Sequence, residues 1–227
     1  MIILFIPEME KTDNEKARYF SNERKEMIPF IPLECVKILE IGCSEGAFGH
    51  LLKSGRMAEV WGVEKEKEAA IQARNKLDFV IQGDFLEIEN QLPRNQFDCV
   101  VLNDVLEHFP DPWNLLLKIL PLLQPGGYVV SSIPNVRYIG NLYELLIKKD
   151  WEYKSSGILD VTHYRFYTKK SILRLFESSG FSVVRIQGIN ATKSFKVKLV
   201  SWLTFGFLED IRYLEFAIVA CLPSGTR

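Results

Sequence analysis

The chain has 227 residues, of which 47% are hydrophobic, 28 are lysine or arginine and 29 are aspartate or glutamate. This length suits one α/β domain with a large core and is too short for two such domains. The near balance of charge excludes the basic excess that drives most nucleic-acid binding, so we expect no nucleic-acid partner.

The cysteines and the apolar runs indicate a reducing compartment. Cys35, Cys43, Cys99 and Cys221 each lie in or beside an apolar run and show no Cys-x-x-Cys spacing, so we expect buried free thiols. No apolar run reaches the about 20 residues of a membrane-spanning helix, and the start lacks the basic residues of a signal peptide. The predicted location is the cytoplasm.

Residues 1–34 open with a short apolar tip and continue as a charged segment with few apolar positions, and Pro29 and Pro32 near its end bar a long helix. We predict a helical lead-in that either packs beside the core or closes as a lid over a ligand site. The main domain is then expected over residues 35–227.

The first strong pattern spans residues 36–49. A short apolar run over 36–41 predicts a buried strand, and a helical pattern begins at residue 48. Between them, Gly42 and Gly46 permit positive φ and a close approach of ligand to the backbone, with Cys43 and Ser44 in the same turn. Glu40 at the strand end would repel a pyrophosphate and suits a cationic ligand instead.

The rest of the chain alternates apolar runs with helical patterns, which is typical of an α/β fold. Further strands are predicted at 59–64, 79–82, 97–102, 125–135, 181–186 and 215–222, and helices at 66–76, 113–123 and 169–179. Thr168 is expected to cap the last of these helices, which ends at Gly180.

Five motifs in order resemble class I S-adenosylmethionine-dependent methyltransferases, in particular small-molecule O-methyltransferases such as those of quinone biosynthesis. They are the turn from Glu40 to Gly46, Glu64, Gly83-Asp84, Val105-Leu106-Glu107-His108 with Pro110-Asp111-Pro112, and Leu-x-Pro-Gly-Gly at 123–127. The string His-x-Arg-Phe-Tyr-Thr at 163–168 is similar to one subgroup. Ser44 replaces the usual middle glycine. The resemblance implies a Rossmann-like, doubly wound sheet of seven strands, mostly parallel with an antiparallel last strand.

The resemblance also implies S-adenosylmethionine as cofactor. Glu64 would accept both ribose hydroxyls, Asp84 would hold the adenine amine and Phe85 would pack on the adenine ring. The expected cofactor residues are Glu40, Gly42, Cys43, Ser44, Gly46, Glu64, Lys65, Asp84, Phe85 and Asn103. The alternative for Glu64 is a solvated acid at the start of a charged run, and the alternative for Gly83-Asp84 is an ordinary turn.

The acceptor is expected among residues 136–168, with a second insertion at 190–212. By the resemblance the acceptor is a small molecule with a hydroxyl group: a glycan, a quinone-like compound or a secondary metabolite. His108 and His163 are the candidate bases, and Asn135, Tyr164 and Arg165 the candidate substrate residues. A structural alternative has Asp160, His163 and Arg165 fixing the loop by hydrogen bonds to one another.

Methyl transfer requires no metal, and none is expected. An alternative remains, because Asp104, Glu107 and His108 have a spacing seen, with glutamate first, in some magnesium-assisted methyltransferases. His163 would be a fourth ligand there.

Residues 192–210 combine three lysines with aromatic and aliphatic side chains. The segment is predicted to be a pocket cover, a dimer face or a peripheral membrane contact, and the protein a monomer or homodimer. Two other functions stay open. A nucleotide-sugar or NAD-dependent oxidoreductase would need a Tyr-x-x-x-Lys pair that is absent near the fifth strand, and a non-catalytic scaffold would bind the cofactor without turnover.

Overall fold

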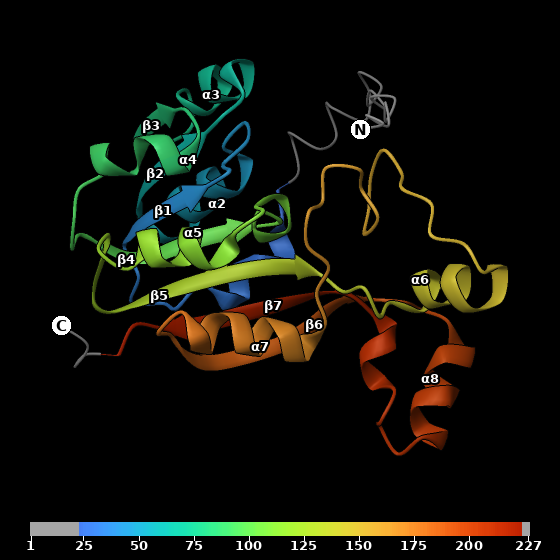
Figure 1. Cartoon of the computed structure of the whole chain (residues 1–227). Coiled ribbons are helices and arrows are strands. Elements are labelled where there is room, and N and C mark those ends of the chain that lie inside the picture. Colours follow the sequence, from blue (N-terminus) through green and yellow to red (C-terminus); the bar gives the residue numbers. More distant parts are fainter. Residues whose placement is uncertain (1–22, 224–227) are drawn as a thin grey trace.

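The computed structural model describes residues 23–223, which form a seven-stranded sheet with the strand order β3-β2-β1-β4-β5-β7-β6 (Figure 1). The strands are β1 Lys37–Ile41, β2 Glu59–Glu64, β3 Phe79–Gln82, β4 Phe97–Asn103, β5 Leu123–Pro134, β6 Ser182–Ala191 and β7 Tyr213–Cys221. Neighbours from β3 to β5 pair in parallel, whereas β7 is antiparallel to both β5 and β6. The predicted seven-stranded, mostly parallel sheet with an antiparallel last strand is confirmed.

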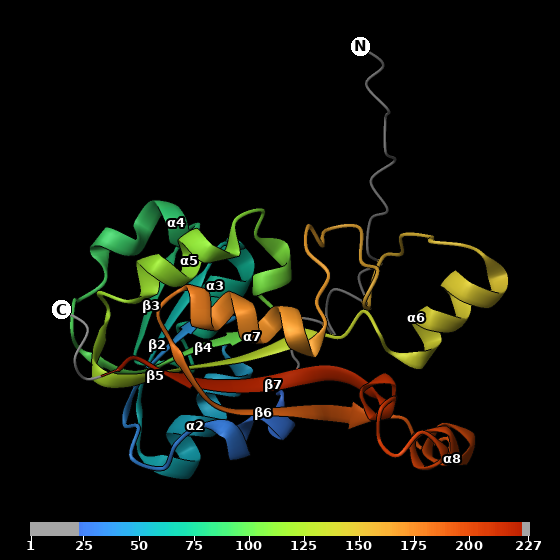
Figure 2. The same ribbon diagram turned by 60° about the horizontal axis from the view of Figure 1, so that its bottom comes forward.

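Helices cover both faces of this sheet (Figure 2). The 3-10 helix η1 Lys25–Phe30 and the α-helices α2 Ala47–Arg56 and α3 Lys67–Ala73 contribute to the buried cluster on one face. The other face carries α4 Phe85–Ile88, α5 Pro112–Ile119 and α7 Lys169–Ser178. Short 3-10 turns lie at η2 Glu89–Gln91 and η3 Leu106–His108. Parallel strands covered on both sides must be apolar throughout, which explains the apolar runs of the sequence.

The two predicted ends of α7 are confirmed, whereas the predicted end of α5 is wrong. Thr168 and Ser171 form a capping box at the start of α7, and the chain leaves that helix at Gly180 with a φ of 90°. The helix predicted over 113–123 instead ends at Ile119, because β5 begins already at Leu123. The Pro-Gly-Gly sequence is an irregularity inside β5, where the pairing shifts between Phe97 and Cys99 of β4.

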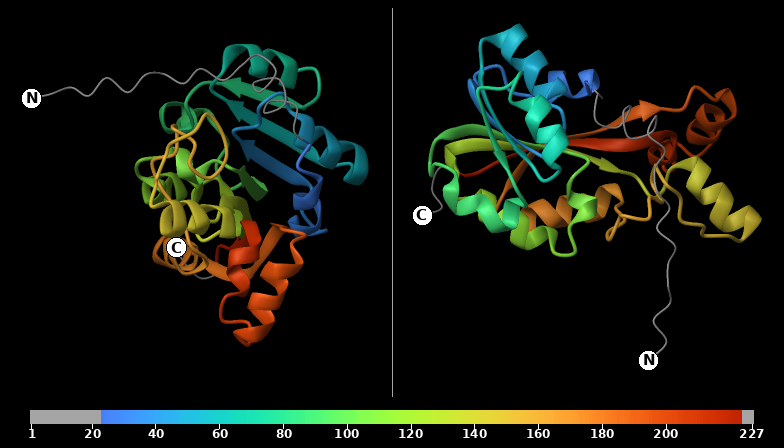
Figure 3. Two further views of the ribbon diagram at one scale, coloured as in Figure 1. Left: turned by 90° about the vertical axis from the view of Figure 1, so that its right-hand side faces the viewer. Right: turned by 90° about the horizontal axis from the view of Figure 1, so that it is seen from above.

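The two insertions protrude at one end of the sheet (Figures 1 and 3). The first contains α6 Ile139–Tyr143 and the π-helix η4 Glu144–Lys148, and the second contains α8 Phe195–Leu203 and the 3-10 helix η5 Glu209–Arg212, between β6 and β7. Both stand clear of the helical layers.

Other expectations concern the termini, the thiols and membrane spans. Most of the predicted lead-in lies outside the described residues, and the described part of it holds the short helix η1 with Pro29 inside. Cys35, Cys43 and Cys99 are buried as expected, whereas Cys221 is half-buried. Between residues 23 and 223, no helix is long and apolar enough to cross a bilayer.

Candidate active site

A cavity of about 560 Å³ lies at the carboxyl ends of β1, β2 and β4, where parallel α/β sheets generally bind ligands. Its volume falls within the range of small-molecule sites. The lining contains Arg24, Glu40, Ile41, Gly42, Cys43, Ser44, Phe48, Val63, Glu64, Lys65, Glu66, Gly83, Asp84, Phe85, Leu86, Asn103, Asp104, Val105, His108, Phe109, Pro110 and Tyr164. Most of the expected cofactor residues are therefore brought together in the lining of one cavity.

The turn after β1 brings backbone close to the cavity. Gly42 has a φ of 71°, and a Cβ atom there would lie 2.9 Å from the Val105 side chain, so only glycine fits without displacement. Ser44 adopts a left-handed φ of 52° in place of the usual glycine. Gly46 lies behind the cavity lining and makes room for Ala73 of α3, so its small size serves helix packing.

Glu64 at the end of β2 is a fixed, buried carboxylate. One carboxylate oxygen accepts the Ser44 backbone N–H at 2.7 Å and the other accepts the Glu66 N–H at 2.8 Å. A carboxylate offers about four acceptor positions, so two remain for a ligand in the cavity. The geometry suits a vicinal diol, as the resemblance implies.

Glu40 and Asn103 present polar atoms that no other described residue binds. Glu40 Oε2 and both side-chain polar atoms of Asn103 are buried without a hydrogen-bond partner in the part of the chain that the structure describes. Burial, reinforced by the nearby charge of Glu64, raises the pKa of Glu40 to about 8. Unsatisfied buried groups at a cavity wall indicate a polar ligand.

Asp84 and its neighbours form the far wall. Asp84 Oδ1 accepts the Leu86 N–H at 3.0 Å and so caps α4, and Lys65 Nζ lies 3.5 Å from Asp84 Oδ2. Thus Asp84 has the turn role that the sequence left open, in addition to lining the cavity. Phe85 belongs to the hydrophobic core and is 2% exposed, so only a small part of its surface reaches the cavity.

Asp104, in the loop after β4, lines the cavity together with Arg24. Arg24 Nη1 lies 2.7 Å from Asp104 Oδ2, and Arg24 Nη2 lies 2.9 Å from Glu215 Oε2 on β7. Ser132 Oγ donates to Asp104 Oδ1 at 2.9 Å. Burial lowers the pKa of Arg24, but Asp104 and Glu215 together raise it above its ordinary value. These contacts make Asp104 part of an ion-pair network.

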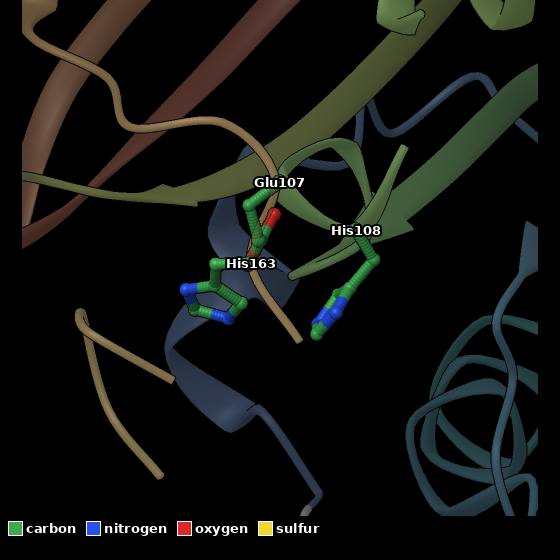
Figure 4. Close-up of side chains that lie close together, drawn as sticks. All are labelled: Glu107, His108 and His163. Carbon is green, nitrogen blue, oxygen red and sulfur yellow. The ribbon is translucent and has the colours of Figure 1, made fainter. Parts of the chain in front are cut away.

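Glu107, His108 and His163 gather in a second cluster beside the cavity (Figure 4). One potential ligand atom from each residue lies within 4.8 Å of the others. The centroids of the two imidazole rings lie 4.7 Å apart, in an edge-to-face arrangement. Glu107 is 1% exposed, and neither of its carboxylate oxygens has a hydrogen-bond partner among residues 23–223. Burial, together with the charge of Asp104, raises the pKa of Glu107 well above its ordinary value.

Backbone hydrogen bonds hold this cluster together. The Tyr164 and Arg165 N–H groups both donate to the Glu107 carbonyl oxygen, at 2.8 and 3.2 Å. The Tyr167 hydroxyl donates to the Leu106 carbonyl oxygen at 3.3 Å. The loop that carries His163 is thereby fastened to the loop that carries Glu107, across more than fifty residues of sequence.

The candidate substrate residues lie in different surroundings. Tyr164 lines the cavity and is 67% exposed. Asn135 is fully buried away from the cavity, and its amide group donates to the carbonyl oxygens of Asp210 and Tyr213, so it fixes the chain after β5. Arg165 donates to the Pro110 carbonyl oxygen at 2.6 and 2.9 Å and also lies outside the lining. Both placements favour structural roles over the expected substrate contacts.

Two features of the site were missed by sequence reasoning. Arg24 lies in a charged segment where nothing marks it for burial. Glu215 was missed as well, although a glutamate within the apolar strand β7 is a signal that sequence reasoning could have used. The expected loop contacts hold in part, since the His163 N–H donates to the Asp160 carbonyl oxygen at 3.0 Å, whereas Arg165 donates to Pro110.

Comparisons with known proteins agree with this geometry. A family model described as "Methyltransferase domain" matches residues 6–186. The "Ubiquinone biosynthesis O-methyltransferase" of Aeromonas salmonicida is 30% identical over 162 residues, which cover 68% of this chain and 66% of that protein. The match thus spans just under two thirds of that relative's length.

Solved structures show the same fold. A "SAM dependent methyltransferase" from Archaeoglobus fulgidus has a TM-score of 0.62 at 23% identity, covering 91% of this chain and 92% of that one. A "possible histamine N-methyltransferase" from Thermotoga maritima has a TM-score of 0.63 at 20% identity, covering 92% and 95%. With the family match over most of its length, the chain belongs to the class I S-adenosylmethionine-dependent methyltransferases.

Proposed function

We propose that the protein transfers a methyl group from S-adenosylmethionine to a hydroxyl group of a small, ring-shaped acceptor. The observation that carries the proposal is the cavity at the ends of β1, β2 and β4, which has ligand-ready carboxylates on one side and the Glu107–His108–His163 cluster beside the other. The relative named for O-methylation in ubiquinone biosynthesis supports a hydroxyl acceptor.

The residues present fit the cofactor. Glu64 would hold the ribose with its two remaining acceptor positions, and Asp84 would hold the adenine amine through Oδ2, whose partner in the structure is the exposed Lys65 at 3.5 Å. Glu40 and Asn103 offer unsatisfied polar atoms to the charged amino-acid end. Gly42 leaves space that a Cβ atom would fill. When bound, S-adenosylmethionine supplies an electrophilic methyl group on a sulfonium centre.

The chain itself contributes positioning and a path for one proton. The acceptor hydroxyl must lose its proton as the new bond from oxygen to carbon forms, and His108 reaches the cavity from the cluster that could receive this proton. Val105, Phe109, Pro110 and Tyr164 give the same side apolar and aromatic surface, which suits a flat ring.

Calorimetry and product detection test this function. S-adenosylmethionine should bind with one site per chain, whereas NAD and nucleotide sugars should not bind. With a panel of catechols, other phenols, quinone precursors and sugars, formation of S-adenosylhomocysteine should be largest for ring hydroxyls. Cofactor binding without turnover on any acceptor would favour the scaffold function, and preferential NAD binding would contradict the proposal.

The exposed aromatic side chains of the second insertion support contact between the protein and a lipid surface. Such contact would bring the protein close to an apolar acceptor. Phe205, Phe207 and Trp202 are 100%, 84% and 74% exposed on a protrusion that stands clear of the sheet (Figure 1). Lys193, Lys196 and Lys198 accompany them, and such a combination favours anionic lipid headgroups.

Vesicle sedimentation tests the lipid contact. Vesicles of phosphatidylcholine with phosphatidylglycerol should carry the protein down more strongly than phosphatidylcholine alone. Replacing Trp202 and Phe205 by serine should abolish the difference. A dimer in solution that the same variant dissociates would instead assign this surface to a second copy of the chain.

A further inference from the structure

We propose that the second insertion holds a binding site for one molecule of a long-chain carboxylate, separate from the cofactor cavity. A second cavity of about 500 Å³ is lined by α8, the turn after it and η5. It shares no lining residue with the cofactor cavity, and its volume falls within the range of small-molecule sites.

The cavity is built from two elements that pack against each other. On α8, Lys198, Ser201 and Trp202 are spaced by three or four residues, which places their side chains on one side of the helix. On η5, Glu209 and Arg212 are three residues apart, and Arg212 Nη1 lies 3.8 Å from Glu209 Oε1. One side of each element therefore faces the same space.

Arg212 supplies a donor that lacks an acceptor. Its Nε atom is buried and has no hydrogen-bond partner among residues 23–223. Its guanidinium group lies over the Tyr213 ring, 5.3 Å from the ring centroid, and this stacking favours one orientation of the planar group. Buried polar atoms without partners are rare, so an unpaired donor on a residue that lines a cavity indicates an acceptor group on a ligand. Guanidinium groups pair especially well with carboxylates, through two parallel hydrogen bonds.

The balance of charge in the lining selects a monoanion. Lys198 and Arg212 bring two positive charges, and Glu209 brings one negative charge, which leaves one positive charge. Glu209 Oε1 also accepts the Tyr213 hydroxyl at 3.0 Å, so this carboxylate is held by the protein's own contacts. A carboxylate ligand would neutralise the remaining charge, whereas a phosphate monoester would bring nearly two negative charges.

The rest of the lining is apolar and predicts the tail of the ligand. Trp202, Leu203 and Phe205 line the cavity and are exposed, Phe205 completely. Phe205 also adopts a left-handed φ of 50°, which is an unfavourable conformation for a bulky residue. Strain of this kind is typical of ligand-binding segments. An aliphatic chain would bury the exposed rings while its carboxylate meets Arg212.

A membrane surface and a single carboxylate molecule would use different cations of this insertion. Lys193 and Lys196 lie outside the cavity lining, so they can attract an anionic surface without contacting a ligand in the cavity. The Arg212 side chain is only 25% exposed, so a flat lipid surface reaches it poorly. Mutation of Arg212 therefore separates ligand binding from the lipid contact.

Calorimetry of the full chain with dodecanoate tests the site. Below the concentration at which dodecanoate forms micelles, one molecule should bind per chain. Acetate has the same head group without the tail, and dodecyltrimethylammonium has the same tail with the opposite charge. Neither should saturate the protein, because the site needs both the anion and the apolar chain.

Two variants of the lining sharpen this test. Arg212→Gln should weaken dodecanoate binding by about 10-fold or more, since it removes a charge-assisted hydrogen bond. Phe205→Ser should weaken it by about 10-fold, since it removes a large apolar surface that the tail would cover. Lys196→Gln removes a charge from the same helix outside the lining, so it is the matched control and should bind like the unchanged protein.

Several results would overturn the site. These are the lack of saturable dodecanoate binding, equal affinity for dodecyltrimethylammonium, and binding unchanged in both Arg212→Gln and Phe205→Ser. Because Arg212→Gln can fail to fold, the unchanged protein is also melted with dodecanoate and with acetate, and equal melting temperatures would likewise overturn the inference.

Vesicle sedimentation and cofactor titration separate this site from the other proposals. Arg212→Gln should still sediment with phosphatidylglycerol vesicles. Loss of sedimentation in Arg212→Gln would instead assign Arg212 to the lipid contact and overturn the separate site. Failure of S-adenosylmethionine to bind the unchanged protein would remove the proposed methyl transfer and leave the carboxylate site in place.

Discussion

The turn after β2 and the loop after β4 lie on the same cavity and treat buried carboxylates in opposite ways. At β2, Glu64 receives one backbone N–H group from its own turn and one from the turn after β1. At β4, Arg24 bridges Asp104 and Glu215 of β7, and Glu107 still lacks hydrogen-bond partners among the described residues. The first arrangement prepares a fixed ligand for a neutral group, and the second prepares a site for positive charge or a proton.

Removing Arg24 should give the largest effect, because it leaves the carboxylates of the β4 loop unbalanced. Breaking a buried ion pair by deleting one partner costs about 3 to 5 kcal/mol of stability, and the Arg24 side chain is only 10% exposed. Arg24→Met should therefore lower the free energy of unfolding by about that amount in urea denaturation. Lys25→Met, which removes an exposed pair with Glu23, is the control and should change it little. Equal effects of the two variants would contradict the balance described for this loop.

Glu40 of β1 lines the same cavity and tests a further buried carboxylate through pH. Its pKa of about 8 in the folded protein lies above the ordinary value of 4.5, so the folded state holds a proton that the unfolded state releases between these values. The stability contribution is present below about pH 4.5 and is lost as pH rises toward 8, amounting to about 3 to 4 kcal/mol between pH 5 and pH 8. Glu40→Gln should remove this loss.

Comparing the unchanged protein with Glu40→Gln separates the pH-dependent stability due to Glu40 from that due to other groups. Glu215 also has a pKa raised by burial, to about 7, so the unchanged protein and Glu40→Gln should both lose some stability over this range. The difference between their denaturation curves at pH 5, 6.5 and 8 measures Glu40 alone. Parallel pH profiles would show that Glu40 does not hold a proton in the folded state.

The sequence predicts the sheet well because its strands follow a local rule. Buried parallel strands read as apolar runs, and the observed bounds of β1, β2 and β3 agree with those expected to within one residue. The polar residues at strand ends divide differently. The place of Glu64 at the end of β2 is predictable from the apolar run before it, although one partner of its carboxylate, Ser44, comes from the turn after β1.

The rest of the site depends on packing between distant segments, which leaves no periodic signal. Arg24, Asp104 and Glu215 meet from three parts of the chain. Asn135 follows the rule that polar residues after a strand face the ligand, yet the hydrogen bonds to Asp210 and Tyr213 draw it into the packing against the second insertion. Sequence reasoning finds the residues at the ends of strands and misses the contacts that three distant segments must assemble.

Replacing Glu64 should affect cofactor binding more than folding. Glu64→Ala removes one or two charge-assisted hydrogen bonds to the ribose, each about 1.5 to 3 kcal/mol, so affinity for S-adenosylmethionine should fall about 10²-fold by calorimetry. Glu68→Gln on α3 is exposed and should bind normally. Unchanged affinity in Glu64→Ala would remove Glu64 from the site and leave it only the role of holding the turn.

The smallest effect should come from the close approach between Gly42, in the turn after β1, and Val105, in the loop after β4. A methyl group at residue 42 would meet Val105 Cγ2 at 2.9 Å, and an alanine there would have to adopt a φ of 71°. Gly42→Ala therefore carries both a steric and a backbone cost. Val105→Ala removes the steric part only. In a double-mutant cycle the two changes should therefore be less destabilising together than their sum, by about 0.5 to 1 kcal/mol.

Cofactor affinity then separates the two contributions at this contact. If Gly42 serves chiefly to let the ligand approach the backbone, Gly42→Ala should weaken S-adenosylmethionine binding even when Val105→Ala has relieved the contact. If the small residue serves chiefly to accommodate Val105, the double variant should regain the affinity of the unchanged protein. Additive stability changes in the cycle would contradict direct contact between the β1 turn and the β4 loop, which both line the cavity.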